Sequence, residues 1–392
     1  MKVLYIHNDY GRPSGEEQAA NEIVELLRSH GHEVRWFKRT SEGYRESLAG
    51  NIKAFFTGIY NPCTANALAK VLDEYRPDIV QVQNLYPFIS TSIFRPLRER
   101  NIPVVMRCPN YRLFCPQGLC LDNHGIVCER CWRGAHELNC ITHNCLNSFF
   151  KSTAYAIRNW YGRVSKNIIN GVDVFITQSE FQKQKFVSMG LDDDRIGILP
   201  GIPPTIGNIA ERELGDGVTF VGRVSPEKGI YEFIEAAKMN QDIPFKVAGN
   251  LDEQFKIPAD CPENVEFVGF KKGNELNQLY VDSRIIVIPS KWYEGFPNVI
   301  LRGMLLKRPV ITTSIGAMQS IIDQNVNGLL VRPGDSQQLG EAIKRLYPNK
   351  DKCIEMGING YKKATSVYSR ETINHSLMDI YQRAITRRKH YA

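Results

Sequence analysis

A polar turn at Gly222–Gly229 carries two cations beside the start of a predicted helix. The turn reads Gly-Arg-Val-Ser-Pro-Glu-Lys-Gly and joins an apolar run, Val218–Val221, to a helical pattern at Ile230–Met239. Free N–H groups and the positive dipole end at a helix N-terminus favour anions. Arg223 and Lys228 add charge-assisted donors at the same place. The turn therefore predicts a cradle for a diphosphate.

A second corner between a strand and a helix supplies a carboxylate. The apolar run Ile285–Ile288 predicts a buried strand, and Pro297 followed by Asn298–Leu306 predicts a helix with proline in its first turn. Glu294 and Gly295 lie in the intervening turn. Ligands of open α/β sheets bind outside the carboxyl ends of the strands. We therefore expect a binding site at this corner.

Together the two corners resemble the donor site of retaining glycosyltransferases with the GT-B fold, family four or group 1. The first corner matches the family's Gly-Arg-Xaa-Xaa-Xaa-Glu-Lys-Gly motif in full. The second corner contains, as Glu294, the first of two glutamates that the family spaces eight residues apart, but the second glutamate is replaced by Arg302. Ser320 also stands where a glutamate is usual. The segment 110–116, Asn-Tyr-Arg-Leu-Phe-Cys-Pro, resembles a motif of the bacterial surface-polysaccharide enzymes.

The resemblance implies an α/β fold of two Rossmann-like, doubly wound domains that face each other across a cleft. Residues 1–200 would form the acceptor-side domain, residues 201–370 the nucleotide-sugar donor domain, and a C-terminal helix at 371–392 would pack back on the first. The implied reaction moves a sugar from a UDP- or GDP-sugar to a glycan or lipid-linked acceptor, with retention at the anomeric carbon. Surface-polysaccharide synthesis is the implied pathway.

The resemblance also implies roles for individual residues. Glu294 would be the catalytic residue, holding the hydroxyls of the donor sugar and stabilising positive charge on its ring. The donor-binding residues would be Gly15, Arg223, Lys228, Gly295, Phe296, Pro297, Asn298 and Arg302. Gly15 comes from Ser14-Gly15-Glu16-Glu17, a partial match to the family's N-terminal glycine loop. Since these donors can neutralise a leaving diphosphate, catalysis requires no metal or other cofactor.

Arg302 keeps an alternative open. The family's second glutamate accepts hydrogen bonds from ribose hydroxyls, whereas a guanidinium only donates them. A degenerate, non-catalytic protein that binds a sugar nucleotide or a partner enzyme would explain both Arg302 and Ser320. Alternatively, a spacing of eight residues is about two helical turns, so Arg302 could pair with Glu294 or meet an anionic group of the donor. A GT-B epimerase or phosphorylase is disfavoured, because the sequence shows no motif for either.

Cysteines are concentrated in a Cys-rich loop at 108–145, which holds seven of the ten in the chain. A Cys-x2-Cys pair, Cys128 and Cys131, could supply two thiolates to a structural zinc, and Cys115 and Cys145 could complete a tetrahedron. Such a closed site would fix the loop and take no part in catalysis. The alternative is a cysteine-rich loop without metal.

The elements that must position these residues alternate along the chain. Apolar runs at 3–7, 79–83, 103–108 and 173–178 predict strands separated by helices, which indicates parallel sheets. The segment Asn147–Ile169 predicts an amphipathic helix that packs on the core, with contact to an anionic membrane as the alternative. A net charge of +7, spread along the chain, favours small anions or a membrane surface over nucleic acid. Without a signal or membrane-spanning segment, we expect a cytoplasmic protein, peripheral on the inner membrane face where it contacts lipid.

Overall fold

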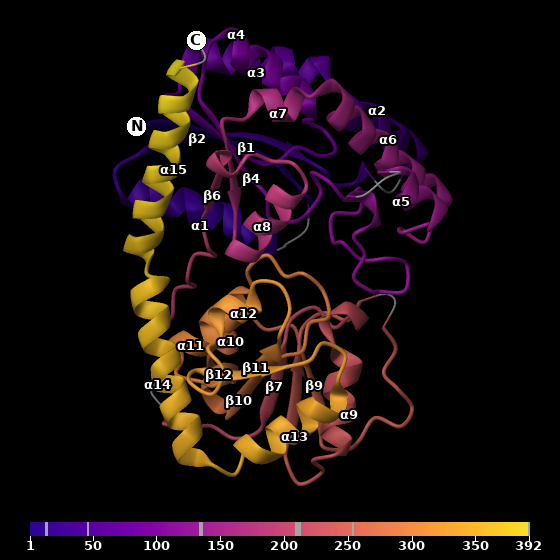
Figure 1. The fold of residues 1–392 in the computed structure, drawn as a ribbon, viewed down its shortest axis with the longest axis vertical. Coiled ribbons are helices and arrows are strands. Elements are labelled where there is room, and N and C mark those ends of the chain that lie inside the picture. Colours follow the sequence, from indigo (N-terminus) through magenta and orange to yellow (C-terminus); the bar gives the residue numbers. More distant parts are fainter. Residues whose placement is uncertain (12–14, 45–46, 133–135, 208–212, 253–254, 391–392) are drawn as a thin grey trace. The chain divides into compact units, whose positions relative to one another are not determined.

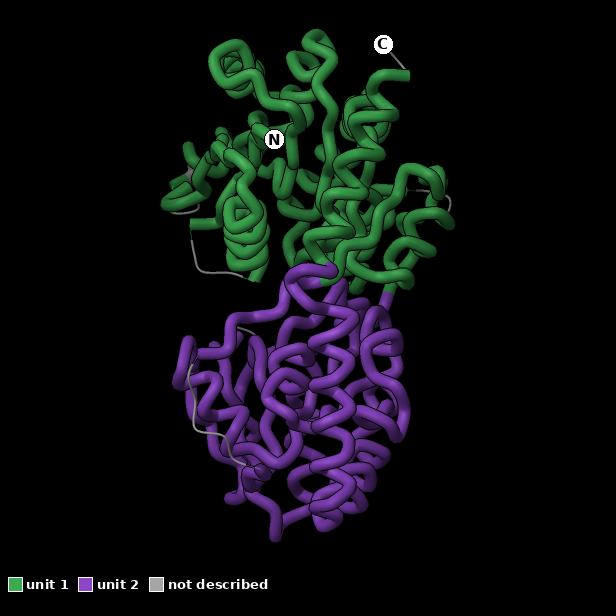
Figure 2. The backbone as a smooth tube through the Cα atoms, turned by 90° about the vertical axis from the view of Figure 1, so that its left-hand side faces the viewer, with its two compact units in different colours: residues 1–123, 128–200, 373–392 green, residues 124–127, 201–372 purple. Residues whose placement is uncertain are grey.

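The computed structural model describes residues 1–11, 15–44, 47–132, 136–207, 213–252 and 255–390. Ser14, part of the predicted glycine loop, lies outside these ranges. The chain divides into two compact units (Figure 2). Unit 1 contains residues 1–123, 128–200 and 373–392, and unit 2 contains residues 124–127 and 201–372. Among the described helices, none is both long and apolar enough to cross a membrane.

The described part of unit 1 contains a parallel sheet of six strands in the order β2-β1-β3-β4-β5-β6. The strands are β1 (Lys2–Asp9), β2 (Glu33–Thr40), β3 (Ile79–Asn84), β4 (Val104–Arg107), β5 (Val174–Thr177) and β6 (Ile196–Ile198). Strands β3 and β5 are buried along their whole length, as expected for a sheet covered on both faces, although β3 contains the polar residues Gln81, Gln83 and Asn84. The predicted doubly wound α/β fold is thus confirmed for this unit.

Helices flank this sheet in Figure 1. They are α1 (Gly15–Ser29), α2 (Leu48–Ile59), α3 (Pro62–Tyr75), α4 (Phe94–Glu99), α5 (Leu138–Thr142), α6 (Phe149–Ser165), α7 (Asn167–Gly171) and α8 (Glu180–Ser188). The predicted helix at Asn147–Ile169 is interrupted, because Lys166 adopts a left-handed conformation between α6 and α7. The sequence reasoning did not identify α2 or α3, although Asn61 and Pro62 form a helix-start signal before α3.

The C-terminal helix α15 (Arg370–His390) packs on unit 1 along its buried residues. Ile380 lies so close to Gly197 that a Cβ added there would be 2.6 Å from Ile380 Cγ1. Arg388 pairs with the buried Asp173 at 2.9 Å. Tyr381 donates a hydrogen bond to Gln81 on β3. The last helix therefore contributes polar contacts as well as apolar packing to the first unit.

The described part of unit 2 also contains six parallel strands, in the order β12-β11-β10-β7-β8-β9. The strands are β7 (Val218–Val221), β8 (Phe245–Ala248), β9 (Val265–Gly269), β10 (Ile285–Ile288), β11 (Val310–Thr313) and β12 (Gly328–Val331). The helices are α9 (Ile230–Lys238), α10 (Gly273–Asp282), α11 (Asn298–Leu305), α12 (Met318–Ile321), α13 (Ser336–Leu346) and α14 (Lys350–Val367). Within the segment Asn327–Gly334, residues Gly328–Val331 pair with β11 as the edge strand β12.

Close backbone approaches bring the loops of unit 2 together above the sheet. Gly229 has a φ of +79°, and a Cβ there would lie 2.0 Å from the carbonyl oxygen of Pro289. A Cβ on Gly249 would lie 1.7 Å from the carbonyl oxygen of Gly222. Only glycine fits at both positions, so the loops after β7, β8 and β10 depend on it.

Gly229→Ala and Gly269→Ala separate backbone strain from this close approach. Gly269 in the same unit also has a positive φ, of +71°, but nothing lies within 4 Å of its Cβ position. We expect Gly269→Ala to cost about 1–2 kcal/mol through its left-handed backbone. Gly229→Ala should cost about 1–3 kcal/mol more through overpacking. Urea unfolding of both variants measures the difference, and equal losses would contradict the close approach at Pro289.

Candidate active site

The candidate site of unit 2 lies where the strand order reverses. Strands β7 and β10 are neighbours, with Ile286 opposite Thr219, although β8 and β9 separate them in sequence. The turn after β7 carries Lys228, and the turn after β10 carries Glu294. Since parallel strands end at the same edge of a sheet, the two predicted corners meet at a topological switch point, the usual ligand position in such folds.

The Glu294 carboxylate is buried and held by several donors. Its side chain is 8% exposed, and its Oε1 accepts from Lys228 Nζ at 2.5 Å. Ser290 Oγ donates to the same oxygen at 2.6 Å, and Trp292 Nε1 donates at 2.9 Å. Buried charges in proteins are ordinarily paired, as Glu294 is here with Lys228. The sequence reasoning missed Ser290 and Trp292, although both lie in the same turn as Glu294.

The predicted cations differ in their surroundings. Lys228 lies against Glu294 and 5.1 Å from the centre of the Trp292 ring, with 23% of its side chain exposed. Arg223 is 49% exposed, pairs with Glu227 in its own turn, and lies 3.7 Å from Asp252. Both cations have carboxylate partners, so an anionic ligand must compete with these carboxylates for the two side chains.

The N-terminus of α11 completes the corner. The helix begins at Asn298 and has no side-chain cap, so N–H groups of its first turn are available to a ligand. Pro297 immediately precedes the helix instead of lying in its first turn. Phe296 packs against Tyr368, with ring centres 5.3 Å apart. The predicted Gly295–Asn298 set therefore lies at the same sheet edge as Glu294.

Arg302 does not form the expected pair with Glu294. The expectation that eight residues of helix separate Glu294 from Arg302 is wrong. Glu294 lies in the turn before α11, and of the two residues only Arg302 is helical. Lys228 is the cation at Glu294, and Arg302 donates to Asn277 on α10. Ser320, at the other replaced glutamate, donates to the carbonyl of Ala317 at 2.7 Å.

Gly15 lies in unit 1, whereas the other predicted donor-binding residues lie in unit 2. It is the exposed first residue of α1, and nothing lies within 4 Å of its Cβ position. Its predicted role with the donor remains a prediction. The next residues bind the preceding loop: Glu16 accepts from Tyr10 Oη at 2.9 Å, and Glu17 accepts from Tyr10 N at 2.6 Å.

The expected set of Cys115, Cys128, Cys131 and Cys145 lies close together, because burial and the neighbouring Cys115, Cys145 and Cys128 raise the pKa of Cys131. A hydrogen bond from Cys120 lowers the pKa of Cys115 to about 7, and a hydrogen bond from Cys140 lowers the pKa of Cys145. Cys131, Cys140 and Cys145 belong to one small buried cluster. Among the described side chains, no three His, Cys, Asp or Glu residues are placed to hold a metal ion. The structural zinc remains a prediction.

Comparison with known proteins places these features in a family context. Residues 215–349, which include both corners of the site, match the family described as glycosyl transferases, group 1. The capsular polysaccharide biosynthesis glycosyltransferase CapM of Staphylococcus aureus is 27% identical over 173 residues, which are 42% of this chain and 45% of that protein. The amylovoran biosynthesis glycosyltransferase AmsK of Erwinia amylovora is 24% identical over 229 residues, or 54% and 56% of the two chains. The chain thus spans about half the length of these relatives.

A solved structure extends the likeness to the whole fold. The crystal structure of Anabaena HepE in complex with UDP has a TM-score of 0.66 at 17% identity, over 97% of this chain and 100% of that one. The same protein was also solved with UDP-glucose. The predicted α/β fold with two Rossmann-like units, the GT-B class, is confirmed.

The fluorescence of Trp292 should report ligand binding at this corner. A diphosphate that draws Lys228 away from Glu294 also removes a cation from the Trp292 ring, so we expect a change in indole emission on titration with a nucleoside diphosphate. Trp292→Phe should abolish the change, while Trp36→Phe in unit 1 should retain it. If Trp292→Phe shows the same emission change as the wild type on titration, the ligand binds elsewhere.

Proposed function

We propose that this chain is a retaining, metal-independent glycosyltransferase that moves a sugar from a UDP- or GDP-sugar to a glycan acceptor in surface-polysaccharide synthesis. The observation that carries the proposal is the buried Glu294–Lys228 pair at the switch point of unit 2. This pair lies inside the segment that matches group 1 glycosyl transferases. The relatives named for capsule and amylovoran synthesis support the pathway, and the UDP-bound neighbour supports the donor class.

The geometry supports a division of labour during transfer. As the bond between sugar and diphosphate breaks, negative charge grows on the leaving oxygen. Lys228, Arg223 and the first N–H groups of α11 can stabilise that charge without a metal. When Lys228 turns to the phosphate, Glu294 Oε1 keeps the donors Ser290 and Trp292 and gains a free lone pair. That lone pair can accept a hydroxyl of the donor sugar, and the carboxylate stabilises positive charge on its ring.

The donor site is tested by calorimetric measurement of UDP and GDP binding to the wild-type chain and to Lys228→Met. We expect one nucleotide to bind and the variant to lose about 10–100-fold in affinity, the range of a charge-assisted hydrogen bond. Lys363→Met is the control. Lys363 lies on α14 of the same unit and also pairs with a carboxylate, that of Asp323, at 2.8 Å. Product analysis with the matching sugar nucleotide then tests retention. No nucleotide binding to the wild type, with binding gained by Arg302→Glu, would favour the degenerate alternative.

We also propose that unit 1 contacts an anionic membrane, which would give access to a lipid-linked acceptor. The expected packing of α6 by an apolar face is reversed: the buried residues are Ser152, Ala156, Arg158, Asn159 and Gly162. The exposed large apolar residues on α6 and its neighbours α2 and α5 are Phe149, Phe150 (84% exposed), Trp160, Val164, Ile52, Phe56 and Leu138. We call these seven residues the apolar face. Tyr60, directly after α2, contacts Tyr161 of α6, so the helices that carry most of the apolar face are in contact.

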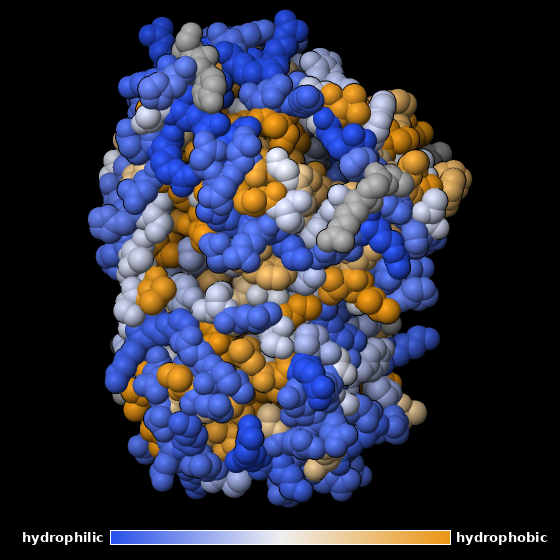
Figure 3. All heavy atoms as spheres, viewed as in Figure 1, coloured by the Kyte–Doolittle hydropathy of each residue, from blue (hydrophilic) through white to orange (hydrophobic). Residues whose placement is uncertain are grey.

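Apolar atoms gather in Figure 3 over the helices that Figure 1 labels α2, α5 and α6. Exposed basic residues accompany the apolar face: Lys53 on α2, Lys151 on α6 and Lys166 at its end. Aromatic rings that enter the interface, with lysines beside anionic headgroups, are the pattern of a surface-bound helix.

Combined substitution of Phe149, Phe150 and Trp160 by serine should lower co-sedimentation with anionic phospholipid vesicles by at least about tenfold. Phe270→Ser provides the control, because Phe270 is a 58% exposed aromatic residue in unit 2. Binding should also fall with added salt, since the lysine contribution is screened. Equal sedimentation of the triple variant and the control would contradict the proposed membrane contact.

A further inference from the structure

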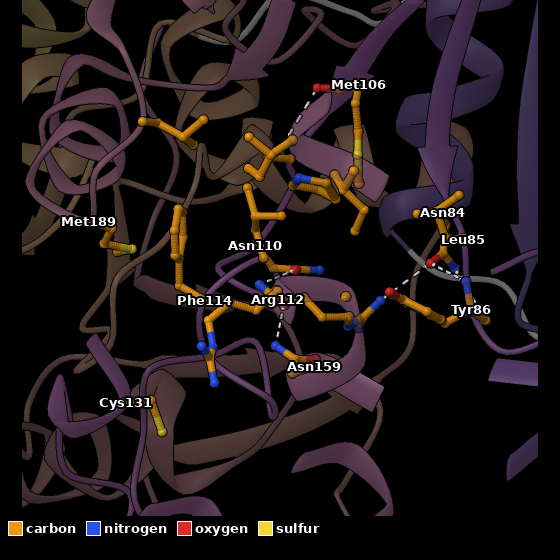
Figure 4. A pocket seen from close by; sticks show the side chains of 18 of the residues that line it. Asn84, Leu85, Tyr86, Met106, Asn110, Arg112, Phe114, Cys131, Asn159 and Met189 are labelled. Atoms are coloured by element: carbon orange, nitrogen blue, oxygen red, sulfur yellow. Dashed lines mark hydrogen bonds between the residues drawn. The ribbon is translucent and has the colours of Figure 1, made fainter. Parts of the chain in front are cut away.

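Unit 1 contains a cavity of about 260 Å³ at the carboxyl ends of β3 and β4. Its lining includes Glu16, Gln83, Arg107, Arg112 and Asn159. In Figure 4 Arg112 lies between Asn84 and Asn159, which donates to its carbonyl oxygen at 2.8 Å. The cavity belongs to unit 1 alone and shares no residue with the candidate site of unit 2.

Several buried donors in this cavity lack an acceptor. Among the described residues, Arg107 Nε and Nη1, Arg112 Nε and Gln83 Nε2 have no hydrogen-bond partner. Arg107 is 1% exposed and Gln83 is 2% exposed. Val82 pairs with Met106, so Gln83 and Arg107, one residue further along, lie side by side on the same face of the sheet. Unpaired buried donors are rare and costly, and here they are clustered.

The orientation of the Gln83 amide is fixed by a relay of hydrogen bonds. Tyr381 on α15 donates to Gln81 Oε1. Gln81 Nε2 donates to Tyr5 Oη at 3.3 Å, and Tyr5 Oη donates to Gln83 Oε1 at 2.9 Å. The oxygen of Gln83 is thereby satisfied and its nitrogen remains a free donor in the cavity. Glu16 Oε1 is also without a partner, so the unpartnered atoms of the cavity are mostly, but not all, donors.

The charges of the cavity are unbalanced in the same sense. No described ion pair includes Arg107 or Arg112. Arg112 Nη1 donates to neutral partners, Asn84 Oδ1 at 3.3 Å and Tyr10 Oη at 3.4 Å. Glu16 is the nearby carboxylate, and burial raises its pKa above the ordinary value. Burial lowers the pKa of Arg107, and the nearby Glu16 and Glu22 carboxylates act in the opposite direction.

We propose that this cavity binds a phosphate or diphosphate group, which the unpartnered N–H donors of Arg107, Arg112 and Gln83 hold as the anionic part of the acceptor. Two guanidinium groups and an amide suit the several oxygens and multiple charge of a phosphoryl group better than a single carboxylate. The anion site stands on the geometry of unit 1, whereas its assignment to the acceptor rests on the proposed transferase function. The phosphoryl group belongs either to a lipid diphosphate or to a phosphorylated glycan.

Calorimetric titration with inorganic pyrophosphate tests the anion site, using the full chain with Lys228→Met to weaken the predicted diphosphate cradle of unit 2. We expect one binding site, weakened about 10–100-fold by Arg107→Gln and about tenfold by Gln83→Leu. Arg100→Gln is the matched control, because Arg100 pairs with Asp73 on the surface of the same unit. It should leave the affinity unchanged. No pyrophosphate binding, or equal binding by Arg107→Gln and the control, would overturn the proposal.

Thermal unfolding without anion distinguishes a ligand-binding arginine from a structural one. A buried guanidinium without an ion-pair partner adds little stability to the free chain, so Arg107→Gln should not lower the unfolding temperature in buffer alone and should lose the rise that pyrophosphate causes. A lower unfolding temperature in buffer, with the rise retained, would make Arg107 structural and overturn the proposal. Competition of pyrophosphate with a short-chain alkyl diphosphate or a sugar 1-phosphate assigns the source of the group. Pyrophosphate binding in unit 1 without nucleotide binding in unit 2 would retain the anion site and reject only the transferase.

Discussion

The convergence of Lys228, Ser290 and Trp292 on one oxygen of Glu294 is the contact on which the candidate active site depends. It requires the loop after β7 to touch the loop after β10, two segments that adjoin only because the strand order reverses between them. The absence of a side chain at Gly229 permits this approach, since a Cβ would meet the Pro289 carbonyl at 2.0 Å. Gly229 thus acts by letting the two backbone segments approach closely. This approach brings Lys228 into contact with Glu294.

Much of unit 2 could be predicted from sequence because its strands are short, continuous apolar runs bounded by turns. The predicted strand Ile285–Ile288 has the same bounds as β10. The predicted turn with Arg223 and Lys228 follows β7, as expected from the motif. The edge strand Gly328–Val331 was missed, because it has only four residues and begins with a glycine, which gives little periodicity. Arg302 was misjudged for a different reason: counting residues as helical turns fails when the helix begins between the two residues compared.

Unit 1 shows where such reasoning ends. The cavity depends on the register of β3 against β4 and on a hydrogen bond between Tyr381 and Gln81, which are 300 residues apart. Neither is encoded in local spacing, and Gln81 and Gln83 would ordinarily be interpreted as polar residues in a buried strand. The orientation of α6 could not be predicted either. The periodicity of apolar residues identifies the apolar side of a helix, but it does not say whether that side packs on the protein or is exposed.

The proposed anion sites of the two units differ in whether their cations already have carboxylate partners. In unit 2 the cations have carboxylate partners, so a diphosphate must displace Glu294 from Lys228 and Glu227 from Arg223, which lowers net affinity and eases release. In unit 1, Arg107 Nε and Nη1 have no described partner, so an anion there displaces no hydrogen bond of these two groups. A transferase that must release its nucleotide after each transfer while it holds the acceptor for the reaction would gain from this asymmetry. The paired cations therefore fit the group that leaves, and the unpaired donors fit the group that stays.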